Sequence, residues 1–301
     1  MILRTLCALA ALSGPALGQV PAPAPVAPAP VVPAPVVPAP VTPAPVARDA
    51  EIQAIQDALR LPELLAILSR EGEEHGRTLG ASLFGEGRAP AAWADRVAAL
   101  HDPARLDGPI RAALSEGLAL ADTAAILAFL RSPPGEAMVG LELAAREALL
   151  DDDAEQAARE AAAVALAEED PRLDLLRRYA EAADLIDSNV AAAMNASLAY
   201  LGGLRAGGGL GADATEADAI ADVWEQEPRL RAETTEWLYA FLLRAYAPAS
   251  DSEIESLVAF LESPPGRTLN QAVFRAFDAA MADLSRDLGL AAARVLTTEE
   301  I

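Results

Sequence analysis

The chain has 301 residues, and its 45 acidic residues against 23 basic residues, all of them arginine, give a formal charge of -22. A surface this acidic repels phosphate backbones and anionic membranes, which excludes nucleic acid as a partner. Hydrophobic residues make up 52% of the chain but aromatic ones only 4%, so we expect a folded chain with a core mainly of alanine and leucine, which favours packed helices over sheets.

The N-terminus has the pattern of a secretory signal peptide. Arg4 precedes an apolar stretch from Thr5 to Leu12, and small residues follow as far as Gly18. A cleavable signal over residues 1–18 predicts a periplasmic or secreted protein, and its apolar stretch is shorter than the roughly 20 residues of a stable membrane span. The one cysteine, Cys7, lies in the signal, so the mature chain has no thiol for disulfides or nucleophilic catalysis. Removal of Arg4 changes the charge from -22 to -23.

A proline-rich segment follows the signal. Between Pro21 and Val46 only proline, alanine, valine and one threonine occur, and these 26 positions hold 11 of the 23 prolines. Proline fixes φ and removes backbone donors, so we predict that residues 19–47 form a disordered, extended linker, which at about 3.1 Å per residue reaches roughly 80 Å. Such a linker either holds the folded part away from another structure or binds a partner that recognises proline-rich segments.

The rest of the chain has apolar residues at helical spacing, interrupted by prolines and glycines that end helices. This pattern predicts an all-α protein, and no segment has the alternation typical of strands. The helices expected between residues 49 and 201 are 49–59, 63–84, 91–100, 103–118, 123–131, 133–150, 154–168 and 171–201.

An eight-residue motif occurs twice. Ala-Phe-Leu-Arg-Ser-Pro-Pro-Gly at 128–135 recurs at 259–266 with glutamate in place of arginine, an offset of 131 residues. This recurrence predicts a duplicated unit. We therefore expect a helical bundle built from two related helical halves, 48–170 and 171–301.

The repeated motif predicts a sharp corner between two helices. Proline disfavours helical geometry in the residue before it, so one helix ends at the serine, which then caps the next helix while proline begins it. The glycine lets the two helices approach closely, and the phenylalanine points into the core. An alternative is that the free amides at this helix start bind an anion. The corner residues are Phe129, Ser132, Pro133, Gly135, Phe260, Ser263, Pro264 and Gly266.

At this motif the chain resembles a bacterial family of exported, all-helical proteins, catalogued as domain of unknown function twenty fifty-nine. Its members have a helix that ends in an aromatic residue followed by Ser-Pro-x-Gly, as at 129–135, and opening helices similar to 58–65. Residues 185–189 and 222–228 resemble the two-copy alphaproteobacterial form. The resemblance covers most of residues 50–298. It implies export and a helical fold, and no catalytic residues.

The residues that could carry chemistry form no recognisable catalytic motif. His75 with Glu71 and Glu74 has the residue types of a metal site, but adjacent residues on a helix point in different directions, so we expect a solvated charged face. The aspartates at 151–153 suit a helix N-cap and lack the spacing of a calcium loop. The glycines at 207–211 follow a helix rather than a strand, which favours a linker over a nucleotide loop. We expect no metal and no cofactor.

A polar set on a helix of the second half is the candidate site: Asp184, Asp187, Ser188 and Asn195. At helical spacing, Asp184 shares one face with Asp187 or Ser188, near Asn195 two turns later. Polar groups that face a core need partners, which Arg177, Arg178 or Arg231 could supply. We predict a buried polar network that fixes how the halves pair, with a ligand-binding site as the alternative.

Aromatic residues of the second half gather around one helix: Trp224, Trp237, Tyr239, Phe241 and Tyr246. Trp237 and Phe241 are one helical turn apart. We expect these residues to pack in the core, and a groove for an envelope lipid or a partner helix is the alternative.

Three functions follow from these patterns. The linker, the acidic helical body and the lack of a catalytic motif predict a non-enzymatic interaction or scaffold protein of the cell envelope, whose partner is an unknown envelope protein. The alternative is a binding module that holds a lipid or other apolar ligand between the halves. A third is a carboxylate-dependent hydrolase of envelope polymers, in which Asp187 or Glu236 would act.

Overall fold

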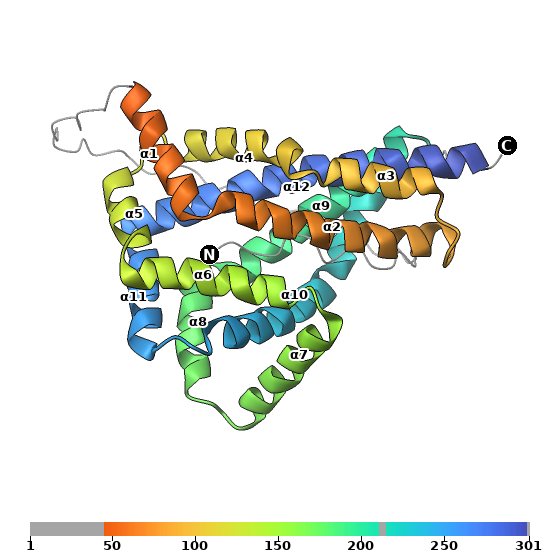
Figure 1. Ribbon diagram of the computed structural model, residues 1–301. Coiled ribbons are helices and arrows are strands. Elements are labelled where there is room, and N and C mark those ends of the chain that lie inside the picture. The colour runs from red at the N-terminus through yellow and green to blue at the C-terminus, as the bar shows by residue number, and fades with distance from the viewer. Residues whose placement is uncertain (1–44, 211–214, 300–301) are drawn as a thin grey trace, which may run out of the picture.

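The computed structural model describes residues 45–210 and 215–299, so the predicted signal peptide and residues 19–44 of the predicted linker lie outside the described residues. Throughout the described residues the regular structure is helical, without a strand (Figure 1), which confirms the predicted all-α class. The helices there are α1 (Pro45–Ala58), α2 (Leu61–Phe84), α3 (Ala91–Leu100), α4 (Pro103–Gly117), α5 (Thr123–Leu130), α6 (Pro133–Ala148), α7 (Asp152–Ala167), α8 (Arg172–Ala182), α9 (Leu185–Ala206), α10 (Glu216–Tyr246), α11 (Asp251–Glu262) and α12 (Pro264–Glu299).

Two predicted boundaries are wrong. The first helix begins at Pro45, inside the range predicted as linker, because proline is tolerated in the first turn, where a backbone N–H has no helical partner. The helix predicted over 171–201 is divided into α8 and α9 by Asp184, whose backbone is left-handed with φ 51°. The side-chain amide of Asn270 on α12 donates a hydrogen bond to the carbonyl of Ala183 at 2.8 Å. This contact from a distant helix stabilises a break that local spacing does not predict.

The two halves follow a matching order of helices. Arg60 between α1 and α2 has φ 52°, and Asp184 between α8 and α9 has φ 51°. The corner between α5 and α6 matches the corner between α11 and α12 at the offset of 131. The chain breaks between α3 and α4 at residues 101–103. At the offset of 131 these residues correspond to 232–234, which lie in the interior of α10. A threonine stands there in place of Pro103, so the helix continues. Helix α7 joins the halves and has no counterpart.

The two corners have the same geometry. The hydroxyl oxygen of Ser132 accepts from the amide of Gly135 at 3.3 Å, and that of Ser263 accepts from the amide of Gly266 at 3.2 Å. A Cβ on the glycine would lie 2.1 Å from the phenylalanine carbonyl oxygen in the first corner and 1.9 Å in the second. Only glycine therefore fits, and the prolines of the motif begin α6 and α12.

The phenylalanines of the two corners contact each other. The rings of Phe129 and Phe260 stack with their centroids 3.9 Å apart and their planes 5° apart. The stack therefore joins the two corners directly.

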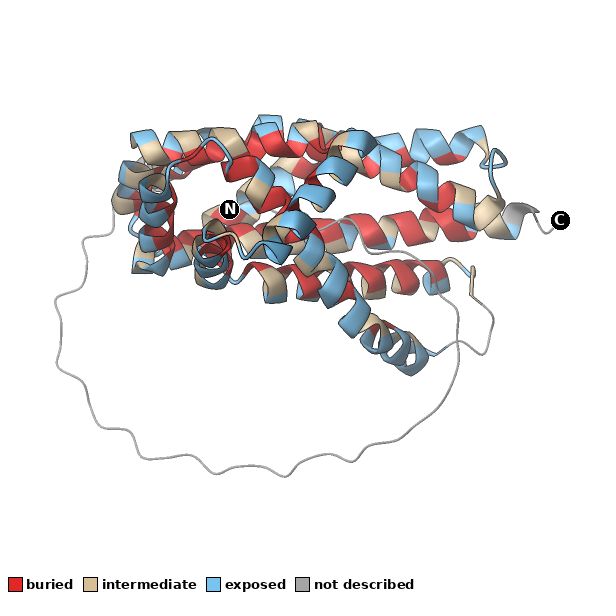
Figure 2. Cartoon of the chain, turned by 90° about the horizontal axis from the view of Figure 1, so that it is seen from below, coloured by how far each residue is buried: buried red, intermediate tan, exposed pale blue. Residues whose placement is uncertain are grey.

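The two halves share one core. Helix α12 runs along the bundle and packs against α4 of the first half as well as α9 of the second (Figure 1). Helix α6 of the first half packs in turn against α10 and α11. Buried residues face the interior (Figure 2), and one continuous apolar cluster joins Leu130 and Met138 of the first half with Leu238 and Leu261 of the second. A site between the halves therefore lies within a single bundle.

Candidate functional site

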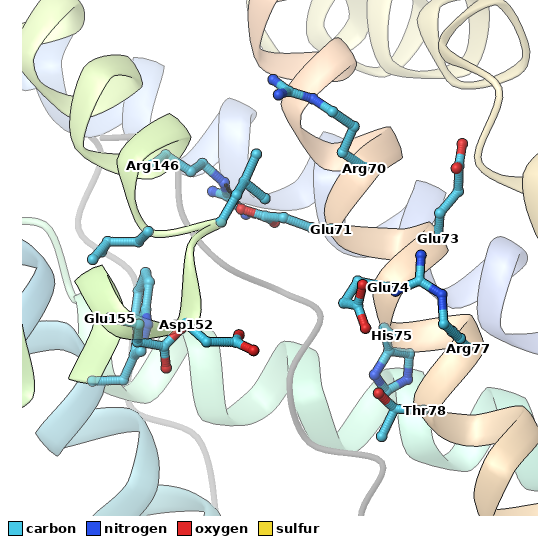
Figure 3. Close-up of a pocket in the computed structure, with 13 residues that line it drawn as sticks. Arg70, Glu71, Glu73, Glu74, His75, Arg77, Thr78, Arg146, Asp152 and Glu155 are labelled. Atoms are coloured by element: carbon cyan, nitrogen blue, oxygen red, sulfur yellow. Dashed lines mark hydrogen bonds and ion pairs between the residues drawn. The ribbon is translucent and has the colours of Figure 1, made fainter. Parts of the chain in front are cut away.

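A cleft opens between the first half and α10 (Figure 3). Helix α2 forms one wall, and the end of α6, the start of α7 and α10 form the other. Its volume of about 580 Å³ is in the range of small-molecule sites. We call it the central cleft; among its lining residues are Arg70, Glu71, His75, Arg146, Asp152 and Trp237.

A buried ion pair joins the two walls of the central cleft. The guanidinium of Arg146 on α6 donates two hydrogen bonds to the carboxylate of Glu71 on α2, at 2.8 and 2.7 Å. The side chain of Arg146 is 3% exposed and that of Glu71 18% exposed. Removing one partner of a buried pair leaves the other charge uncompensated, at a cost of about 3–5 kcal/mol. The pair therefore holds α2 at a fixed distance from α6.

One turn before Arg146, a buried carboxylate connects three helices. Glu142 on α6 accepts hydrogen bonds from the hydroxyl of Tyr179 on α8, at 3.0 Å, and from that of Tyr246 on α10. Burial, together with the nearby Glu142 carboxylate, raises the pKa of both phenols well above their usual value. Both phenols stay protonated and donate. The cluster fixes the spacing of α6 and α10, which form parts of the same wall of the cleft.

Part of the cleft lining is apolar. Leu149 and Leu150 at the end of α6 and Trp237 of α10 all line the central cleft. The indole of Trp237 stacks with the ring of Phe241, with the centroids 5.2 Å apart and the planes 18° apart. This packing fixes the indole in place as a flat apolar surface, which suits an alkyl or aromatic group of a ligand.

The charged part of the lining has an excess of carboxylates. Five carboxylates and three guanidiniums line the central cleft, and each of the three arginines pairs with a glutamate. Among the described residues, no arginine pairs with the lining carboxylates of Glu73 and Asp152. In Figure 3 the side chain of Asp152 extends from α7 toward the α2 wall. The cleft therefore offers carboxylates to a ligand and no unpaired guanidinium.

His75 lies on the α2 wall of the central cleft, next to Glu74. Within residues 45–210 and 215–299, no group of three or more histidine, cysteine or acidic residues is arranged to hold a metal ion.

The predicted polar set lies on the surface of α9. Asp184, Asp187 and Asn195 are exposed, and Ser188 is half-buried. Ser188 donates to Asp184 at 2.8 Å, Arg231 donates to Asp187 at 2.6 Å, and the amide of Asn195 donates to an aspartate of α12 at 3.2 Å. All these partners belong to the second half. The prediction of a buried network that fixes the pairing of the halves is therefore wrong, because the break at Asp184 turns this face of α9 toward solvent.

The carboxylates considered for a hydrolase lie outside the central cleft. Asp187 and Glu236 are exposed, and they pair with Arg231 and Arg159. Neither residue lines the cleft. The two residues therefore form no site there.

Glu142 and Arg146 are not among the site residues predicted from the sequence. The sequence feature that points to these two residues is their position on α6, because both share the buried face of this helix with Met138 and Val139. A charged residue at a core position needs a buried partner. The partners come from α2, α8 and α10, which lie far away in the sequence.

No helix within residues 45–210 and 215–299 combines the length and the apolar character that crossing a membrane requires. Comparison of the chain with protein-family models, with curated proteins and with solved structures gives no match. The resemblance to the exported helical family therefore stays a prediction.

Proposed function

We propose that this chain is a non-enzymatic binding module whose central cleft holds a small amphiphilic molecule with an apolar part and a positively charged group. The observation that carries the proposal is the lining of one cleft by Leu149, Leu150 and Trp237 together with an excess of carboxylates. Apolar contact provides affinity in such sites, and a few polar groups provide orientation. Of the functions that the sequence predicts, this one agrees best with the geometry.

The positive charge of the ligand follows from the ion pairs of the cleft. A bound anion would have to displace a glutamate from an arginine, as at Arg146 and Glu71, or lie beside unpaired carboxylates. A cation gains attraction from Asp152 and Glu73 without breaking a pair. The net charge of -22 adds attraction for cations at a distance.

A preformed cleft supports binding. The pair of Arg146 with Glu71 and the hydrogen bonds to Glu142 connect α2, α6, α8 and α10 before any ligand arrives. Less ordering is then needed on binding, which raises the affinity for a given contact area.

Two further proposals concern the origin and location of the chain. A duplicated helical unit is supported by three features: the matching corners, the left-handed residues Arg60 and Asp184, and the stack of Phe129 on Phe260. The signal pattern over residues 1–18 and the proline-rich run after it support export to the periplasm or beyond, with a spacer before the bundle. Export would make the ligand a component of the cell envelope.

Isothermal titration of the chain with octylammonium, 1-octanol and octanoate tests the charge of the ligand. The three probes share one alkyl chain and differ in the head group. We expect octylammonium to bind with the lowest Kd and octanoate with the highest. An octanoate affinity equal to or above that of octylammonium would contradict the proposal, as would no binding of any of the three.

A matched pair of variants locates the binding site. Leu150→Ser removes apolar contact in the cleft and should raise the Kd for octylammonium about fivefold, which corresponds to about 1 kcal/mol of lost burial. Leu120→Ser is the control, because Leu120 is 98% exposed and does not line the cleft. Equal effects of the two variants would place the binding outside the central cleft.

A further inference from the structure

A stripe of apolar side chains is exposed on the first turns of α10. Ile220 is 40% exposed and Trp224 62% exposed, and Ala217, Ala221 and Pro228 are exposed as well. Positions three, four, seven and eleven residues after the first share one face of a helix. We call the five residues the α10 stripe.

The counterpart of Trp224 in the first half is buried. At the offset of 131, Trp224 corresponds to Trp93, which is 2% exposed. The indole N–H of Trp93 donates to the carbonyl of Gly76 at 2.8 Å, and a Cβ on Gly80 would lie 2.6 Å from the indole nitrogen. Gly80 of α2 therefore leaves room for the indole of Trp93, and Gly76 accepts its hydrogen bond while leaving room for Val97.

The second half lacks this room. The left-handed residues Arg60 and Asp184 relate α2 to α9 by an offset of 124. At this offset, Tyr200 and Leu204 stand in place of the two glycines, and their side chains are buried. Leu204, which stands in place of Gly80, fills the space that an indole would need, and among the described residues Trp224 stays 62% exposed.

Carboxylates follow one edge of the α10 stripe. Asp218, Asp222 and Glu225 are exposed at helical spacing beside it. Asp222 and Glu225 pair with no arginine among the described residues, and Arg229, which follows them, pairs with Glu233. The stripe is thus an apolar surface with a negatively charged edge.

We propose that the α10 stripe docks a basic amphipathic helix of a partner protein. Apolar side chains of that helix would cover Trp224 and Ile220, with the tryptophan as the central anchor, and its lysines or arginines would lie against Asp222 and Glu225. A second copy that used the same stripe would bring two acidic edges together. An anionic lipid surface would be repelled by the same edge. The charge of the edge therefore selects a basic partner.

Fluorescence anisotropy with labelled peptides tests this docking on the full chain. The probe is a leucine–lysine peptide of about 14 residues, patterned as an amphipathic helix. A peptide of the same composition in scrambled order removes the apolar face, and a leucine–glutamate peptide reverses the charge. We expect the patterned basic peptide to bind most tightly and the acidic peptide not to bind.

Variants of the stripe should act on this binding alone. Trp224→Ala should raise the Kd of the basic peptide about tenfold, as removal of an interface anchor does. Ala221→Arg places a cation within the stripe and should weaken binding by repulsion. Leu120→Ala, at a residue that is 98% exposed outside the stripe, should leave the Kd unchanged. Circular dichroism checks that each variant keeps its helix content.

Four results would overturn the proposal. The first is that the scrambled or the acidic peptide binds as tightly as the patterned basic peptide, and the second is an unchanged Kd in both Trp224→Ala and Ala221→Arg. The third is self-association in sedimentation that Trp224→Ala abolishes. The fourth is Trp224-dependent binding to phosphatidylglycerol vesicles. The third result would identify a second copy as the occupant, and the fourth a membrane.

Discussion

Replacing Phe260 with alanine should lower the free energy of unfolding by about 3–5 kcal/mol, as truncation of a buried aromatic residue does. Phe260 is 9% exposed, and its ring stacks on Phe129 with centroids 3.9 Å apart. The variant leaves a cavity where the two corners meet and removes the stack, which by itself contributes about 0.5–1.5 kcal/mol beyond burial. Urea unfolding, followed by the helix signal in circular dichroism, measures the loss of stability.

A control and a double-mutant cycle make this measurement decisive. Trp224→Ala removes a larger aromatic side chain that is 62% exposed and should change stability by no more than about 0.5 kcal/mol. The cycle of Phe129→Leu and Phe260→Leu should show a coupling of about 0.5–1.5 kcal/mol. A loss below about 1 kcal/mol for Phe260→Ala, or a cycle without coupling, would refute the contact between the two corners.

Three other changes test the framework of the bundle. Arg146→Met leaves Glu71 unpaired and should cost about 3–5 kcal/mol in urea unfolding; adding Glu71→Gln should restore part of the loss, and a neutral single variant would contradict the buried pair. Burial lowers the pKa of His101 in the folded chain below its usual 6.5. As the pH falls through 6.5, the unfolded chain therefore binds more protons than the folded chain. The stability that is present above this pH is then lost below it. His101→Gln should therefore lose less stability than the wild type between about pH 7.5 and pH 5, and equal losses would refute this role. Gly266→Ala places a Cβ 1.9 Å from the Phe260 carbonyl oxygen and should cost at least about 1–3 kcal/mol, whereas an unchanged urea midpoint would refute the close approach of the helices.

Local chemistry explains which parts of the fold could be predicted. The corner of Ser132, Pro133 and Gly135 depends on a cap, a fixed φ and a missing Cβ within a few residues, and these are readable in the sequence. The break at Asp184 depends instead on Asn270, which donates to the Ala183 carbonyl from α12. A hydrogen bond between residues so far apart leaves no mark in helical spacing.

The candidate site was harder to predict for a related reason. Alanine-rich helices have little contrast between their faces, so the register of Asp187 and Asn195 on α9 did not show which side meets solvent. The central cleft depends on side chains of four helices, among them Glu71, Arg146 and Trp237, which only the fold brings together. Trp224 illustrates the same limit, because its exposure follows from the volume of Leu204 on another helix.

Titration of octylammonium into Asp152→Asn and Asp153→Asn tests the central claim most directly. Both aspartates lie in the first turn of α7, but only Asp152 lines the central cleft, so the pair separates ligand contact from any effect on the helix. We predict that Asp152→Asn raises the Kd about fivefold at low salt and that Asp153→Asn leaves it unchanged. Equal Kd values for the two variants would contradict recognition of a cation in this cleft.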